Sequence, residues 1–298
     1  MQSVIEYFAA HNINDFVFIP NPGNAGDSLI NAATFQVFDV AGLNYEVHSS
    51  RKLRKAIRAG KSLDALKGRI VVLGGGGAFT SNYTYSSTLI QAIHREVKQL
   101  VLLPCTVEGH ETLLQSLGSN VTIFCRENMS LAHVQKQCNG PEILLHHDMA
   151  FSLNVALLLA QPDSGLGLRK RLRLYFRKRA MDALRQKCGT AELNAFRLDV
   201  EACGREIPPN NKDLSKLFSM GTQTREENFT AAKNLLLQVN MFDHIKTNRL
   251  HVGIASYLLG KRVEFHANSY FKNRAVYELS IEGRDPGGLV NFVVNSNS

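Results

Sequence analysis

Apolar and polar positions alternate in blocks along the first half of the chain. Short runs rich in β-branched and aromatic residues are separated by stretches of helical periodicity, and each run ends at glycine, proline or polar residues: 16–19, 69–73, 99–103, 120–125 and 142–145. Runs of this kind indicate βαβ units with right-handed crossovers and a parallel sheet. Such sheets bind ligands beyond the carboxyl ends of their strands. The pattern therefore predicts an α/β fold with its functional residues at those strand ends.

A second α/β unit is predicted after a basic stretch. Residues 161–190 begin with Gln-Pro-Asp-Ser-Gly and then become basic and helical, so we interpret them as an interdomain connector. Later, an apolar helix that ends at Gly260 lies between predicted strands near 243–246 and 261–265. We therefore expect two Rossmann-like domains that face each other across a cleft. The expected boundaries are 1–160, the connector 161–190, and 191–298.

Composition narrows the class of protein. Hydrophobic residues make up 44% and charged residues 20% of the 298 residues, as in a soluble chain of one large or two ordinary domains. No run of about 18 apolar residues is present, and the N-terminus lacks the basic and apolar regions of a signal peptide. The five cysteines are scattered without a CxxC spacing. A reduced, cytoplasmic protein is expected.

The net charge of +8 is concentrated in two basic segments, 51–61 and 169–179. No nucleic-acid-binding motif accompanies this charge, so nucleic acid is not an expected partner. Apolar residues lie between the cations of each segment, which suits a basic amphipathic helix on an anionic membrane surface. A solvated helix face is the simpler alternative.

Two glycine-containing segments follow predicted strands. Residues 23–28 (GNAGDS) open a helix but contain neither the GxGxxG fingerprint nor a P-loop, and a tight turn without a ligand would use the same glycines. Asp27 is either a helix cap or a ligand for hydroxyl groups. Four consecutive glycines at 74–77 are costly in backbone entropy, which favours a loop that faces a ligand.

Charged residues at other strand ends are candidates for chemistry. Arg249 and His251 are predicted in the first helical turn after Thr247 and Asn248, where free N–H groups favour an anion and an arginine suits a phosphate. The alternative is a surface arginine with a half-buried histidine. Arg126 follows a strand and is either an anion ligand or the partner of an acid.

Asp148 follows the last predicted strand of the first half and is either a general base, a hydroxyl acceptor or a helix cap. The adjacent His146 and His147 point in different directions, so no metal site is expected.

In the order and spacing of these motifs, the chain resembles the polysaccharide pyruvyl transferase family. The matching elements are 23–27, 74–77, 126–130, 147–151, 196–201, 247–251 and 268–274. Asn248 stands where the family often has aspartate, and Phe271 where glycine is common. The resemblance implies a fold like that of two-Rossmann glycosyltransferases. It also implies pyruvyl transfer from phosphoenolpyruvate to a sugar of a cell-surface polysaccharide or its lipid-linked precursor, with a pyruvate ketal and phosphate as products and no cofactor.

The resemblance assigns roles to the candidate residues. Cations are expected to bind the phosphate and carboxylate of the donor, in the donor set Arg126, Arg249, Arg274, Lys272 and Asn273. The glycine-rich loops at strand ends carry no cation, which suits a neutral sugar, and they are expected to bind the acceptor through Gly23, Asn24, Asp27, Gly75, Gly76 and Gly77. His251 is the expected general acid, with Asp27 or Asp148 taking the hydroxyl proton.

One geometric condition applies to this assignment. In an ideal helix Arg249 and His251 would lie about 200° apart, so they converge only if the first turn is irregular.

Two other functions share features with this pattern. A nucleotide-sugar glycosyltransferase would have the same architecture, but no E-x₇-E pair follows His251. A non-catalytic subunit of a polysaccharide assembly complex would use the basic segments for docking. In each case the chain is expected in the cytoplasm, with peripheral contact to the inner membrane face.

Overall fold

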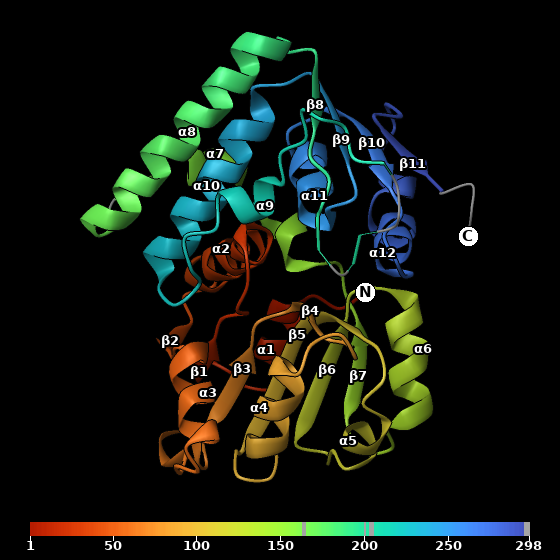
Figure 1. Ribbon diagram of the computed structural model, residues 1–298. Coiled ribbons are helices and arrows are strands. Elements are labelled where there is room, and N and C mark those ends of the chain that lie inside the picture. The colour runs from red at the N-terminus through yellow and green to blue at the C-terminus, as the bar shows by residue number, and fades with distance from the viewer. Residues whose placement is uncertain (163–164, 200, 203–205, 295–298) are drawn as a thin grey trace. The chain divides into compact units, whose positions relative to one another are not determined.

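The computed structural model describes residues 1–162, 165–199, 201–202 and 206–294 (Figure 1). The chain forms two compact units. The first comprises Met1–Pro22 and Ala33–Ser152, and the second comprises Gly23–Ala32 and Leu153–Ser298. Helix α2 (Ala25–Val40) therefore begins in the second unit and ends in the first.

A parallel sheet of seven strands forms the centre of the first unit. Its strands are β1 (Asp15–Ile19), β2 (Asn44–Val47), β3 (Ile70–Leu73), β4 (Gly76–Phe79), β5 (Gln99–Val107), β6 (Val121–Cys125) and β7 (Glu142–Leu145). The order is β2-β1-β3-β5-β6-β7, and β4 pairs with the far end of β5. The direction of winding reverses between β1 and β3, which is the point where doubly wound sheets bind ligands.

The strands of the first unit are apolar along their whole length because both faces of the sheet are covered. In β1, Val17 and Ile19 belong to one core cluster. The alternate residues Phe16 and Phe18 point to the other face, where their rings contact Phe38 of α2. The remaining helical elements are α1 (Val4–Ala10), α3 (Ser50–Arg58), η1 (Asp64–Leu66), α4 (Tyr85–Ile93), α5 (Glu111–Gln115), α6 (Asn128–Gln137) and η2 (Met149–Ser152).

The second unit contains a smaller parallel sheet in the order β11-β10-β9-β8. Its strands are β8 (Glu192–Asn194), β9 (His244–Thr247), β10 (Arg262–His266) and β11 (Val290–Val293). Its helical elements are α7 (Val155–Ala160), α8 (Leu168–Cys188), α9 (Leu214–Leu217), α10 (Arg225–Asn240), α11 (Leu250–Leu258), α12 (Lys272–Ser280) and η3 (Glu282–Arg284). The expected strand–helix–strand pattern before and after Gly260 is confirmed as β9, α11 and β10, and Gly260 has the positive φ of a helix terminator.

The coarse prediction of an α/β fold with parallel sheets is confirmed. The observed division of the chain differs from the expected boundaries in two places. The stretch expected to be a connector forms α8, which packs Leu174, Met181 and Leu184 into the core of the second unit. The start of α2 also belongs to that unit, where the buried side chain of Asn31 donates a hydrogen bond of 2.9 Å to Asn228 of α10.

Candidate functional site

The first turns of α2 and α11 touch within the second unit. A β-carbon built on Gly26 would lie 2.8 Å from Nδ1 and 3.0 Å from Cβ of His251, closer than side chains tolerate. Only glycine fits at this position. The GNAGD segment and His251, which are far apart in the sequence, are therefore direct neighbours in the fold.

The start of α2 is held by its own polar side chains. Asn24 precedes the helix and accepts a hydrogen bond of 2.8 Å from the Gly26 N–H, and Asp27 accepts one of 2.8 Å from the Asn24 N–H. A β-carbon on Gly23 would overlap the Asp27 carboxylate, at 1.9 Å from its oxygen. This explains the two glycines of the motif. Asp27 is the third residue of α2 and not its N-cap, it accepts the Asn24 N–H from within the first turn, and it remains partly exposed.

Arg249 immediately precedes α11 and has an extended backbone, with φ of −85° and ψ of 112°. Because Arg249 lies before the helix, the angular separation that an ideal helix would impose on it and His251 does not apply. Its backbone N–H donates to Thr247 Oγ1 at 3.0 Å. Its guanidinium donates to Asp213 from Nε at 3.0 Å and to Asp199 from Nη2 at 2.8 Å.

Arg249 belongs to a group of six charged side chains beyond the carboxyl ends of β8, β9 and β10, which we call the charge cluster. Its members are Arg197, Asp199, Glu201, Asp213, Arg249 and Lys272. Glu201 accepts from Arg197 and, at 2.5 Å, from Lys272 Nζ. Among the residues that the structure describes, three cations of this cluster thus face three carboxylates.

The pKa of Asp199 shows how strongly these charges interact. Burial alone would raise it, but the hydrogen bond from Arg197 and the charge of Arg249 outweigh burial, so the pKa lies well below its usual range. The structure thus brings Arg249 and Lys272 of the expected donor set into one cluster. Arg197, Glu201 and Asp213 were not among the residues expected to bind the donor or the acceptor. Two signals pointed to Arg197 and Glu201, because both belong to the matching element 196–201 and flank Asp199 directly after a strand end.

Asn273 and Arg274 adopt different positions at the start of α12. Asn273 is fully buried, and its amide donates to the carbonyls of Asn248 at 2.8 Å and His266 at 3.0 Å. It therefore ties together the loops that follow β9 and β10. Arg274 has a side chain that is 63% exposed and pairs with Glu278 one turn along the same helix. Within the described part of the chain, Arg274 forms no ion pair with the residues of the charge cluster.

Arg126 and Asp148 form a buried pair in the first unit. Arg126 Nη1 donates to Asp148 at 2.6 Å, and its Nε donates to Thr106 Oγ1 at 2.9 Å. Asp148 also accepts from the Ala150 N–H at 2.9 Å, so it caps η2. Both side chains are almost fully buried. The acid partner foreseen as the alternative for Arg126 is therefore Asp148, and their roles in donor binding and proton transfer stay predictions.

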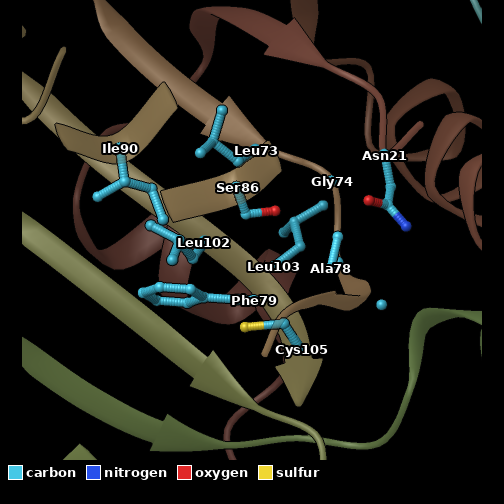
Figure 2. Close-up of a pocket in the computed structure, with 12 residues that line it drawn as sticks. Asn21, Leu73, Gly74, Ala78, Phe79, Ser86, Ile90, Leu102, Leu103 and Cys105 are labelled. Carbon is cyan, nitrogen blue, oxygen red and sulfur yellow. The ribbon is translucent and has the colours of Figure 1, made fainter. Parts of the chain in front are cut away.

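The glycine run lies at the reversal point between β1 and β3, where backbone segments pack closely. A β-carbon would lie 2.4 Å from the Asn21 nitrogen at Gly74 and 2.2 Å from the Pro104 oxygen at Gly75, and Gly76 has a φ of +116°. Figure 2 shows a cavity beside the glycine run, lined also by residues of β3, β4, β5 and α4, with a volume of about 10 Å³. Such a volume holds one water at most. The expected acceptor contacts of Gly75, Gly76 and Gly77 stay predictions.

Other sites considered from the sequence have ordinary structural roles. His146 is bonded through Nδ1 to the carbonyl of His147 at 2.7 Å. No group of three or more metal-ligating side chains occurs in the part of the chain that the structure describes. In the same residues, no helix is both long and apolar enough to cross a bilayer.

Burial raises the pKa of the free Cys105 thiol to about 12, so it is unreactive at neutral pH.

Comparisons with known proteins agree with the motifs. The family model described as polysaccharide pyruvyl transferase matches residues 24–263, which include both sides of the Gly26–His251 contact and end before 268–274. A crystal structure of a functionally uncharacterized protein from Klebsiella pneumoniae has a TM-score of 0.74 with 23% sequence identity, covering 98% of this chain and 97% of that one. This likeness shows a shared fold. No curated protein matches significantly.

Proposed function

The chain belongs to the polysaccharide pyruvyl transferase family, and we propose that it transfers a pyruvyl group from phosphoenolpyruvate to a sugar. The acceptor is a hexose of a cell-surface polysaccharide or of its lipid-linked precursor. Two Rossmann-like domains are part of this proposal, and the two parallel sheets support them.

The reaction requires one proton donor and one proton acceptor. Protonation of the enol methylene makes C2 of phosphoenolpyruvate electrophilic, and a sugar hydroxyl adds to C2 as it loses its proton. A second hydroxyl of the same sugar then displaces the phosphate from C2, and the proton of this hydroxyl is transferred to the phosphate, which leaves as hydrogen phosphate. The product is a pyruvate ketal across two hydroxyls. A general acid in such a step typically contributes about 10²–10⁴-fold.

The Gly26–His251 contact is the observation that carries the proposal. It brings the imidazole next to the first turns of two helices, whose dipoles favour an anion. An imidazole exchanges protons near neutral pH, unlike any other ordinary side chain. His251 is therefore well suited to donate the proton to the methylene or to hydrogen-bond the departing phosphate.

The charge cluster supports donor binding by Arg249 and Lys272. Cations held in place by carboxylates lose little conformational freedom when an anionic ligand arrives. Asp213 is almost fully buried and binds two nitrogens of Arg249, whereas Asp199 is partly exposed and binds one. We expect Asp213 to keep the guanidinium oriented while phosphoenolpyruvate replaces Asp199.

Asp27 is a better candidate than Asp148 for accepting the hydroxyl proton. It is partly exposed and directly follows Gly26, the residue that lies against His251. Asp148 is fully buried and already compensates the charge of Arg126. Gly23 and Asn24 lie in the same turn as Asp27, so the acceptor sugar is expected to bind at the start of α2.

A direct assay tests the proposal. The protein is incubated with phosphoenolpyruvate and lipid-linked oligosaccharides extracted from the cells that make it, and phosphate release is followed together with the mass of the acceptor. Phosphate release that matches formation of one pyruvyl ketal is expected. His251→Ala should lower the rate by at least about 10²-fold. His244→Ala is the matched control, because His244 lies at the opposite end of β9.

Calorimetry separates this function from the alternatives. Binding of phosphoenolpyruvate that is weakened by Arg249→Ala supports the proposal. Binding of a nucleotide sugar without phosphoenolpyruvate would indicate a glycosyltransferase, and binding of neither would indicate a non-catalytic subunit.

A further inference from the structure

The two basic segments of the chain have different surroundings in the structure. In α3, which carries the first segment, Leu53 and Ile57 pack against the core of the first unit. Arg54 lies over the ring of Tyr85, 5.2 Å from its centroid. The apolar residues of this helix are therefore used in folding, and its outer face is an ordinary charged surface.

Helix α8, which carries the second segment, has apolar residues on two opposite faces. Leu174, Met181 and Leu184 are buried in the core of the second unit. On the opposite face four large apolar side chains are exposed, and we call them the outer stripe: Leu168 (73%), Leu172 (49%), Tyr175 (56%) and Phe176 (65%). Their spacing of four, three and one residues aligns them along one side of the helix. Folding of the second unit does not account for this stripe.

The charges of α8 are as unusual as its outer stripe. The helix contains nine Lys and Arg residues and one Asp, so it accounts for the whole net charge of +8. Two of these cations point toward the rest of the second unit, because Lys170 pairs with Glu227 and Arg177 donates to the carbonyl of Ser219. Four exposed arginines border the outer stripe: Arg169, Arg171, Arg173 and Arg179.

We propose that the outer stripe and its four bordering arginines bind the surface of an anionic membrane, with α8 parallel to the bilayer plane. Apolar side chains on one face of a helix enter the boundary between head groups and acyl chains, and flanking cations bind the lipid phosphates. Tyr175 and Phe176 contact each other, with ring centroids 5.5 Å apart, and form a compact aromatic wedge. The four arginines identify anionic lipid as the partner. An apolar stripe that bound a neutral surface would not need cations beside it.

This surface goes beyond pyruvyl transfer and does not depend on it. If the proposed function is correct, the contact holds the enzyme at the membrane that carries a lipid-linked acceptor. If the reaction is a different one, the membrane contact remains testable by itself, with no substrate present.

Co-sedimentation with vesicles tests the proposal. Phosphatidylcholine vesicles that contain phosphatidylglycerol should bind the full chain, pure phosphatidylcholine vesicles should not, and added salt should weaken the binding. Replacing the four bordering arginines with Gln should lower the partition coefficient by about 10²-fold or more, since each cation near an anionic surface contributes about fivefold. The matched control removes four exposed cations from the first basic segment: Lys52→Gln, Lys55→Gln, Arg58→Gln and Lys61→Gln. An equal loss in this control would mean that net charge, and not α8, causes the binding.

The apolar part of the surface has its own test. The chain contains no tryptophan, so Phe176→Trp introduces a single fluorophore on the outer stripe. Its emission should shift to the blue with anionic vesicles. Val40→Trp, at an 84% exposed position of α2, should show no shift. The triple change Leu172→Ser, Tyr175→Ser and Phe176→Ser should lower partition at least about tenfold, with thermal unfolding confirming that the fold is kept.

Three results would overturn the proposal. Equal binding to neutral and anionic vesicles, or binding to neither, would remove anionic lipid as the partner. A blue shift of Phe176→Trp that rises with protein concentration in the absence of vesicles would show that a second copy of the chain covers the outer stripe. Release from the vesicles by duplex DNA would indicate that the arginines serve nucleic acid.

Discussion

Replacement of Gly26 by alanine is the sharpest test of the assembled site, because it adds one methyl group directly against His251. The new β-carbon would lie 2.8 Å from Nδ1 and 3.0 Å from Cβ of His251. Carbon atoms in good contact are about 3.5–4.0 Å apart, so the two helices must separate by about 0.5 Å or more. A change of the His251 rotamer cannot relieve this overlap, since Cβ does not move when the ring turns.

The structure gives an expected size for two effects of Gly26→Ala. Overpacking typically costs about 1–3 kcal/mol. Alanine is favoured over glycine in a helix by roughly 1 kcal/mol, which offsets part of this cost. The free energy of unfolding should therefore fall by about 0–2 kcal/mol. Catalysis is more sensitive, because a misplacement of about 1 Å can cost 10²-fold, and we expect a loss of about 10- to 100-fold in kcat.

The assay is phosphate release from phosphoenolpyruvate in the presence of the acceptor, measured in a double-mutant cycle. If Gly26→Ala acts by displacing the imidazole, it should have no further effect on kcat in a His251→Ala background. Gly283→Ala is the control, since its β-carbon meets no atom within 4 Å. A Gly26→Ala enzyme with near-normal kcat would refute the reasoning. The reasoning would also fail if Gly26→Ala lowered kcat by the same factor in the wild-type and in the His251→Ala background.

Three further perturbations follow from the same geometry. Asp213→Asn removes the buried charge partner of Arg249, and calorimetry should show weaker binding of phosphoenolpyruvate, while breaking such a pair typically lowers stability by up to about 3–5 kcal/mol. Gly75→Ala should destabilise the first unit, measured by urea unfolding, because its β-carbon would lie 2.2 Å from a backbone oxygen. Because the folded-state pKa of Asp199 is depressed, its contribution to stability is present above the unfolded pKa of about 3.9 and is lost as the pH falls below it. Unfolding midpoints measured from pH 5 to pH 3 should therefore fall less steeply in Asp199→Asn than in the wild type.

The sequence predicted the regular parts of the fold because buried parallel strands are apolar along their whole length. The run 16–19 falls within β1, 142–145 coincides with β7, and the family resemblance is confirmed by the match over 24–263. Gly260 ended the predicted helix correctly for the expected reason, a positive φ. Each of these inferences needed only local sequence and the periodicity of the element.

Long-range pairing was beyond the reach of local patterns. Nothing near Arg126 identifies Asp148 as its partner, and nothing near Arg249 identifies Asp213, because the sheet topology brings these residues together. The same limit applies to the basic segments, which look alike in sequence. Both helices pack apolar residues into a core, and only α8 also has a row of exposed apolar side chains, the outer stripe.

The GNAGD glycines also have close neighbours within the protein, which the sequence did not identify. Glycine permits close approach, and the sequence suggested approach of the backbone to a ligand. In the structure the group that approaches Gly26 is the imidazole of His251, and the group that approaches Gly23 is the carboxylate of Asp27. These glycines make room for side chains of the protein, which is consistent with a segment that contains neither the GxGxxG fingerprint nor a P-loop. The start of α2 and the start of α11 consequently constrain each other. A larger residue at Gly26 would displace His251, and a displacement of His251 would alter the packing at Gly26.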